Sequence, residues 1–152
     1  MANATMGKFG FPGTLVRDFG HWAVLVRPAQ VTLGSLILAS TGEATRYSDL
    51  PAAAFGQQGE AIRAIEAALT AFCKYERLNY LMLMMVDPHV HFHVIPRYEG
   101  AREWNGLKFA DAGWPGPPDL GSARTLAAPQ LTALTEELRP LFDEGRGGRD
   151  RD

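Results

Sequence analysis

The order of apolar runs along the chain predicts a mixed domain of strands and helices. Its 152 residues, 46% of them hydrophobic, suit one domain with its own core. The short apolar runs 21–26 and 35–39 are separated by Arg27-Pro28 and Gly34, and such turn residues predict two neighbouring strands. Stretches with helical spacing follow these strands, so we expect both kinds of element in the same domain.

Two helices are predicted from the spacing of apolar residues. The first begins near Ser48-Asp49-Leu50-Pro51, because short polar capping residues followed by proline are typical of a helix start. It runs to about Arg77 and carries an apolar stripe with three- and four-residue steps: Phe55, Ile62, Ile65, Leu69 and Phe72. The second, closing helix runs from about Pro129 to Phe142, with Leu131, Leu134, Leu138 and Leu141 on one face.

Two further strands are predicted between these helices. Residues 79–86 (NYLMLMMV) are almost wholly apolar, which favours a strand buried on both faces. Residues 89–95 alternate polar and apolar, which is typical of a strand with two distinct faces. Since only Asp87-Pro88 ends the first run, we expect the two strands to form a hairpin with a very tight connection.

Charge, cysteine and hydropathy patterns exclude several classes of protein. The chain has 15 Lys and Arg against 17 Asp and Glu, and this lack of a basic excess disfavours binding to nucleic acid. Its single cysteine, Cys73, cannot form an internal disulfide. The opening residues have no apolar signal-peptide core, and there is no apolar run of about 18 residues. We therefore expect a cytoplasmic protein without a membrane partner.

Three of the four histidines fall within residues 89–93. Residues two apart on a strand point the same way, so His89, His91 and His93 are expected to line one face. Three imidazoles do little for core stability, because each has ring nitrogens that need partners when buried. Two functional interpretations remain open. The histidines would hold a zinc-like ion, or one imidazole would attack phosphorus while its neighbours fix its tautomer and protonate the leaving group.

The run His89-Val90-His91-Phe92-His93-Val94-Ile95, followed by Pro96-Arg97, resembles the signature of the histidine triad (HIT) family of nucleotide hydrolases and transferases. In the fragile histidine triad-like branch, which cleaves dinucleoside polyphosphates, the strand also continues into Pro-Arg. The resemblance covers residues 22–98, about half the chain. It implies an α+β fold with an antiparallel sheet, one long helix and a C-terminal helix, and it implies a homodimer.

The resemblance also implies a reaction and roles for particular residues. His91 would attack the α-phosphate of a nucleotide and form a nucleotidyl-histidine intermediate that water later releases. His89 and His93 would orient His91 and bind phosphate oxygens, Arg97 would meet a polyphosphate, and Leu25 would help to wall the nucleoside pocket. No protein-bound metal or other cofactor is expected, although Mg²⁺ can accompany a polyphosphate substrate and neutralise its charge.

The sequence departs from the family pattern at three places. Arg27 stands where relatives usually have an Asn or Asp that holds the ribose, and Ser35 stands where a fourth histidine is common; we keep both as candidate substrate-binding residues. Before the histidines, a Gly-rich phosphate loop is replaced by residues 84–88, in which proline has no N–H and Asp87 repels phosphate. Phosphate binding is therefore expected to be weaker, or to come from the segment around Lys108 or a dimer partner.

These observations predict a HIT-family nucleotide hydrolase that cleaves a phosphoanhydride or phosphoramidate, such as a diadenosine polyphosphate. The alternatives are a nucleotidyl transferase on the same fold, a non-catalytic nucleotide-binding module that has lost the phosphate loop, and a metal protein. The expected segments are a flexible N-terminal arm (1–12), the catalytic domain (13–99), a Gly/Pro-rich loop and helix packed on it (100–143), and a disordered tail (144–152).

Overall fold

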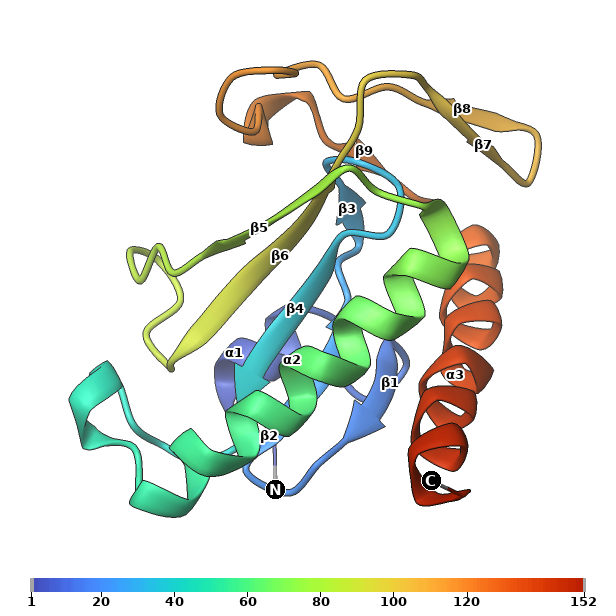
Figure 1. The fold of residues 1–152 in the computed structure, drawn as a ribbon. Coiled ribbons are helices and arrows are strands. Elements are labelled where there is room, and N and C mark those ends of the chain that lie inside the picture. Colours follow the sequence, from blue (N-terminus) through green and yellow to red (C-terminus); the bar gives the residue numbers. More distant parts are fainter. Residues whose placement is uncertain (1, 152) are drawn as a thin grey trace.

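An antiparallel sheet of five strands, in the order β1-β2-β4-β6-β5, forms the centre of the computed structural model, which describes residues 2–151, with side chains as far as residue 143 (Figure 1). Its strands are β1 (Leu15–Asp18), β2 (Trp22–Val26), β4 (Leu36–Ser40), β6 (His91–Arg97) and β5 (Arg77–Leu81). The long helix α2 (Ala52–Cys73) and the C-terminal helix α3 (Ala128–Arg151) cover one face. The expected α+β fold with an antiparallel sheet is confirmed.

The two central strands are apolar throughout because both faces of the sheet are covered. Along β2, Trp22, Val24 and Val26 pack toward α2 and α3, whereas Ala23 and Leu25 belong to a second cluster on the opposite face. A sheet buried on both faces gives continuous apolar runs instead of alternation. The predicted pairing of these neighbours is confirmed, since β2 and β4 run antiparallel over the whole length of each.

The long helix α2 starts close to the predicted position and ends earlier. Its last residue is Cys73, because Lys74 takes a left-handed conformation with φ of 49° and the helix does not continue to Arg77. Phe55 of the expected stripe is exposed and contacts Tyr47 instead of the core. The buried face is formed largely by small residues: Ala54, Ala61, Ala64, Ile65, Ala68, Leu69 and Cys73.

The predicted tight hairpin before the histidines is wrong. Strand β5 ends at Leu81 and β6 begins at His91, so residues 82–90 form a loop between them (Figure 1). Met85 is 87% exposed and Val86 79% exposed, so the second half of the apolar run is not a buried strand. Apolar composition alone does not distinguish a buried strand from an apolar surface loop.

The N-terminal residues pack against the sheet instead of forming a loosely held arm. Residues Ala4–Lys8 form the short helix α1, which Asn3 caps by accepting a hydrogen bond from the Met6 N–H on its side-chain oxygen. Met6 is 2% exposed and packs with Phe9 on the sheet face opposite α2. Asn3 also donates to the backbone oxygens of Ser40 and Gly42, which fixes α1 at the end of β4.

The segment after β6 contains short strands that the predicted loop did not include. Strands β7 (Arg102–Trp104) and β8 (Leu107–Phe109) form a hairpin, and β3 (Ala29–Gln30) pairs with β9 (Arg124–Thr125). Single helical turns, η1 (Tyr47–Asp49) and η2 (Leu120–Ser122), lie elsewhere in the connections. Asn105-Gly106 turns the β7–β8 hairpin with positive φ at both residues, which is typical of a two-residue turn.

The closing helix α3 extends in both directions beyond its prediction. It begins at Ala128, one residue before the expected start, and continues to Arg151 through most of the predicted disordered tail. Asp152 lies outside the described residues. The side chain of Trp104 donates a hydrogen bond to Glu137 of α3 at 2.8 Å, which joins the β7–β8 hairpin to this helix.

Candidate active site

His91 and His93 lie side by side on the sheet face that α1 partly covers. In β6 they stand opposite Ala39 and Ile37 of β4, which belong to the cluster that packs against Met6. Both imidazoles are buried, and their ring centroids are 5.1 Å apart in an edge-to-face arrangement. Two of the three histidines expected on one strand face therefore share it, whereas His89 lies before the first residue of β6.

The hydrogen bond of His91 determines which of its ring nitrogens is free. Its Nδ1 lies 2.8 Å from the backbone oxygen of His89. A carbonyl oxygen can only accept, so Nδ1 carries the proton and donates it. In the neutral imidazole, Nε2 then has an available lone pair. The backbone at His89 thus holds the neighbouring ring in the tautomer that a nucleophile needs.

His93 has the opposite tautomer. The Nε–H of Arg27 donates to its Nδ1 at 3.2 Å, and arginine has no acceptor, so Nδ1 is unprotonated and Nε2 bears the hydrogen. Burial, together with the charges of Arg27 and His91, lowers the pKa of His93 to about 4, and Asp87 acts in the other direction. At neutral pH this ring is therefore an uncharged hydrogen-bond donor.

The ring of His89 turns to the N-terminal helix and to the loop after β4. Its Nδ1 lies 3.0 Å from Thr5 Oγ1, and its Nε2 lies 3.0 Å from Glu43 Oε1. The backbone N–H of His89 also donates to Thr5 Oγ1 at 3.3 Å. Both ring nitrogens of His89 are therefore engaged by protein atoms. Of the three predicted histidines, the structure brings His91 and His93 together beside a cavity and holds His89 next to them.

A cavity of about 200 Å³ opens next to His91 and His93. Its other wall is the β5–β6 loop, residues 83–87. Within the described chain, the backbone N–H groups of these loop residues donate to no protein acceptor. Asp87 is paired with Lys8 of α1 at 2.9 Å, so its negative charge is partly compensated at this cavity. The cavity is thus lined by two imidazoles and by a loop whose backbone N–H groups have no acceptor within the described chain.

Phe9 covers the part of the face where a nucleoside was expected. Its ring centroid is 5.7 Å from that of His91 and 5.8 Å from that of His93. Leu25, the predicted wall of a nucleoside pocket, is fully buried beneath the cluster that contains Met6, Phe9 and Phe11. In this arrangement Leu25 has no surface that a ligand contacts, and the open side of the histidines is the loop side.

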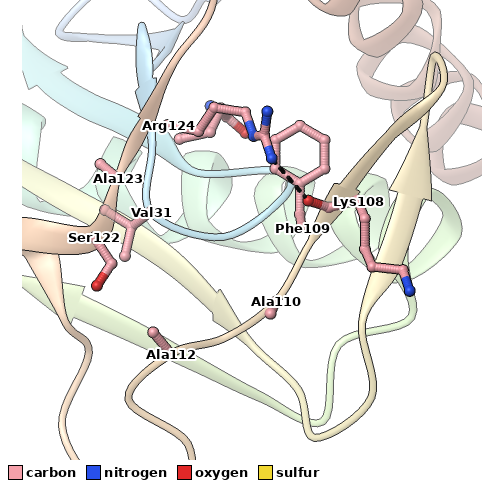
Figure 2. A pocket seen from close by; sticks show the side chains of 9 residues that line it. Val31, Lys108, Phe109, Ala110, Ala112, Ser122, Ala123 and Arg124 are labelled. Carbon is pink, nitrogen blue, oxygen red and sulfur yellow. Dashed lines mark hydrogen bonds between the residues drawn. The ribbon is translucent and has the colours of Figure 1, made fainter.

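The segment around Lys108, considered as a phosphate contact, lies elsewhere. Lys108 and Arg124 line a cavity of about 350 Å³ beside β3, and Arg124 donates to the backbone oxygen of Lys108 at 3.2 Å (Figure 2). The β7–β8 hairpin that carries Lys108 lies beyond the C-terminal end of β6, whereas the histidines lie at its N-terminal end (Figure 1). Lys108 of the same chain is therefore not a contact for a phosphate at His91.

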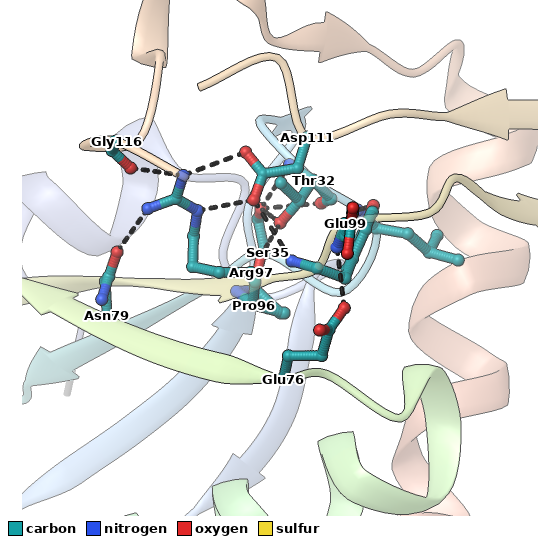
Figure 3. A network of polar contacts seen from close by, with 11 residues as sticks. Thr32, Ser35, Glu76, Asn79, Pro96, Arg97, Glu99, Asp111 and Gly116 are labelled. Carbon is teal, nitrogen blue, oxygen red and sulfur yellow. Dashed lines mark hydrogen bonds and ion pairs between the residues drawn. The ribbon is translucent and has the colours of Figure 1, made fainter. Parts of the chain in front are cut away.

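Arg97 is occupied by a network of protein acceptors (Figure 3). It makes a two-pronged ion pair with Asp111, with distances of 2.7 and 3.1 Å, and donates to Asn79 Oδ1 and the Gly116 oxygen. The structure thus places this cation in a structural network at the far end of the histidine strand. The proposed polyphosphate contact gains no support from this geometry.

Ser35 is a structural residue of the turn before β4. Its hydroxyl donates to the Thr32 backbone oxygen at 2.8 Å and accepts from the Thr32 N–H at 3.1 Å. The side chain is buried, and Thr32 also donates to the Pro96 oxygen, so the turn is tied to β6 (Figure 3). The structure does not bring this hydroxyl to the histidine cavity.

Sequence reasoning missed four residues that contact the histidine region: Thr5, Lys8, Phe9 and Glu43. Thr5, Lys8 and Phe9 lie in the segment expected to be an arm, and nothing in their local pattern indicates a contact with residues 87–93, more than seventy positions away. Asp87 provided one signal, because a carboxylate next to the phosphate site that the resemblance implies would need a compensating cation. Lys8 is that cation.

Within the part of the chain that the structure describes, no three His, Cys, Asp or Glu side chains form a group that could hold a metal ion. The rings of His89, His91 and His93 accordingly do not converge on a common point. Among the same residues, no helix has both the length and the apolar character needed to cross a membrane.

The lowered pKa of His93 predicts a pH-dependent stability. In the unfolded chain this imidazole has its ordinary pKa of 6.5, so between pH 6.5 and 4 the unfolded state binds more protons than the folded state. The free energy of unfolding is therefore expected to fall as the pH drops through this window. Urea unfolding at pH 7 and 4.5 measures the fall, and His93→Gln is expected to reduce it, whereas His21→Gln leaves it unchanged. An equal fall in His93→Gln and the parent would contradict the assignment.

Solved structures share this fold, although neither a family model nor a curated protein matches the sequence. A histidine triad protein from Bradyrhizobium japonicum aligns with a TM-score of 0.66 at 20% identity, over 93% of this chain and 97% of that one. A histidine triad protein from Sinorhizobium meliloti gives 0.65 at 20% identity, over 90% and 95%. The Plasmodium falciparum diadenosine triphosphate hydrolase gives 0.63 at 12% identity, over 88% and 78%. The chain therefore has the fold of the histidine triad (HIT) proteins, as the resemblance of its histidine run predicts.

Proposed function

We propose that this protein is a nucleotide hydrolase that cleaves a phosphoanhydride through a covalent adduct on His91. The observation that carries the proposal is the hydrogen bond from His91 Nδ1 to the His89 carbonyl, which leaves Nε2 unprotonated beside an open cavity. A neutral imidazole in this state is a competent nucleophile at neutral pH without further activation.

The reaction has two displacements at the same phosphorus. In the first, the lone pair of His91 Nε2 forms a P–N bond while the bond from phosphorus to the bridging oxygen breaks, and the leaving phosphate keeps that electron pair. The positive charge that develops on the imidazole is stabilised by the His89 carbonyl at Nδ1. In the second, water attacks phosphorus, the P–N bond breaks, its electron pair returns to Nε2, and the proton of the water passes to solvent.

The state of His93 favours a leaving group that departs as an anion. Because its pKa is lowered to about 4, His93 at neutral pH donates a hydrogen bond through Nε2 and has no additional proton to transfer. A phosphate leaving group needs no proton, whereas the amine of a phosphoramidate does. We therefore propose a phosphoanhydride, such as a dinucleoside polyphosphate, as the preferred substrate. The similar structure from Plasmodium falciparum is named a diadenosine triphosphate hydrolase.

Backbone amides of the β5–β6 loop provide the proposed phosphate contacts. Residues 83–87 line the same cavity as His91 and His93, and within the described chain their backbone N–H groups donate to no protein acceptor. Backbone N–H groups bind phosphate oxygens without contributing a side-chain charge. They would take the place of the Gly-rich loop that the sequence lacks, while Lys8 offsets the repulsion from Asp87.

The experiment is a substrate panel in water labelled with ¹⁸O, with and without Mg²⁺. The panel contains diadenosine tri- and tetraphosphate, a nucleoside phosphoramidate, and a nucleoside monophosphate as the product control. We expect cleavage of the anhydrides, with one ¹⁸O in the nucleoside monophosphate. If an added alcohol or phosphate acceptor took the nucleotidyl group in place of water, so that ¹⁸O no longer entered the nucleoside monophosphate, the protein would be a transferase. Binding without turnover of any compound would contradict the proposal and indicate a non-catalytic nucleotide-binding module.

A further inference from the structure

Among the described residues, Arg27 is the only charged side chain that donates a hydrogen bond to the ring of His93. It follows directly after β2, and its backbone N–H donates to the Ser35 oxygen at 3.0 Å. Its guanidinium donates from Nε to His93 Nδ1 and from Nη1 to the Ala29 oxygen. The guanidinium is thus anchored to the backbone on one side and to the imidazole on the other.

The surroundings of His93 explain why this one contact matters. His91 lies beside it on β6, Asp87 faces it from the β5–β6 loop and is paired with Lys8 of α1, and the Phe9 ring contacts its edge. None of these described neighbours donates to Nδ1, whose donor is Arg27. Without Arg27, the neutral ring would be free to place its hydrogen on Nδ1 and turn a lone pair toward the cavity, where it would repel a phosphate oxygen.

We propose that Arg27 is a positioning residue, which holds His93 in the Nε2–H tautomer so that this ring donates to a phosphoryl oxygen of the substrate. The inference rests on the proposed function for the identity of the substrate, and on the hydrogen bond alone for the tautomer. Arg27 and the His89 carbonyl act as a matched pair. The carbonyl makes His91 an acceptor at Nε2, and the guanidinium makes His93 a donor at Nε2.

This role differs from the one expected at this position of the sequence. A carboxylate or amide oxygen that holds ribose accepts hydrogen bonds from the hydroxyls, and a guanidinium has no acceptor. The charge of Arg27 also opposes a second positive charge on His93, in agreement with the lowered pKa of that ring. Arg27 therefore acts through His93, and its loss is expected to lower kcat more than it raises KM.

The test compares Arg27→Met, which removes the donor and the charge, with Arg27→Lys, which keeps both at a shorter reach. Arg124→Met is the matched control, because that guanidinium lies at the separate cavity beside β3. The primary measurement is the ¹⁵N chemical shifts of the His93 ring between pH 5 and 8, which report the tautomer and the pKa without any substrate. The secondary measurement is kcat and KM with the anhydride from the substrate panel.

In the parent and in Arg124→Met, we expect His93 to be neutral with its hydrogen on Nε2 throughout this pH range. In Arg27→Met, a population with the hydrogen on Nδ1 and a raised pKa is expected, with kcat lowered about tenfold or more, the size seen for partners that orient metal-bound histidines. Arg27→Lys should restore part of both.

An Nδ1–H tautomer in the parent would overturn the inference, even if Arg27→Met fails to fold. Unchanged His93 shifts in a folded Arg27→Met would do the same. A rise in KM at constant kcat would assign Arg27 to substrate binding instead. If no anhydride is cleaved by the parent but the shifts respond as expected, the proposed hydrolase function fails and the positioning of His93 by Arg27 stands.

Discussion

Replacing His91 by asparagine is expected to lower kcat by about 10³-fold or more, since the nucleophile is lost while the shape of the side chain is largely kept. The asparagine amide can still donate to the His89 carbonyl, so the local backbone contact has a substitute. The matched control is His21→Asn, because His21 lies outside the histidine run. Steady-state turnover of a dinucleoside polyphosphate by both purified variants measures the effect.

A covalent adduct provides the second half of this test. Rapid acid-free quenching followed by mass spectrometry of the intact protein should show a nucleotidyl mass increase in the parent and in His21→Asn, and none in His91→Asn. Peptide mapping should then place the adduct on residue 91. Turnover in His91→Asn within about tenfold of the parent would remove the covalent mechanism, because a reaction without its nucleophile falls much further.

The second large effect is expected at the ion pair between Arg97 and Asp111. The two side chains are 5% and 1% exposed, and Asp111 also accepts from the backbone N–H of Tyr98. Asp111→Asn leaves the Arg97 guanidinium buried without its counter-charge, and breaking a buried pair in this way costs about 3–5 kcal/mol. We expect the free energy of unfolding, measured with urea, to fall by this amount.

The exposed pair between Arg46 and Asp49 gives the matched control. Its side chains are 76% and 47% exposed, so Asp49→Asn is expected to change the free energy of unfolding by less than about 1 kcal/mol. A double variant, Arg97→Met with Asp111→Leu, should be more stable than Asp111→Asn because it leaves no uncompensated charge. A loss below about 1 kcal/mol in Asp111→Asn would contradict the structural role of the network.

The parts of the fold that sequence reasoning predicted are those with local signals. Two apolar runs separated by turn residues predicted β2 and β4, and the His-x-His-x-His alternation predicted the common face of His91 and His93. The limits of β5 were not predicted, because Met85 and Val86 are as apolar as a buried strand and yet are exposed. Their surroundings, not their composition, decide their burial.

The connections within the site depend on residues far apart in the sequence. Arg27 and His93 are 66 positions apart, and Thr5 and His89 are 84 apart. No periodicity or spacing reports such a pair, since it arises only when the strands and α1 have packed. The same holds for Arg97, which is a candidate phosphate ligand by its place in the sequence and is engaged by a carboxylate from a later loop.

The ion pair between Lys8 and Asp87 affects how fast a ligand can reach the histidine cavity. It is the salt bridge that links α1 to the loop over the histidine cavity, and its lysine is 53% exposed. Its carboxylate is 16% exposed, so the pair is partly accessible to solvent and is weakened by salt. Salt is therefore expected to weaken this ion pair, whereas the hydrogen bonds between Thr5 and His89 continue to hold α1 to the loop. The association rate of a ligand, more than its chemistry at His91, should then vary with the salt concentration of the solution.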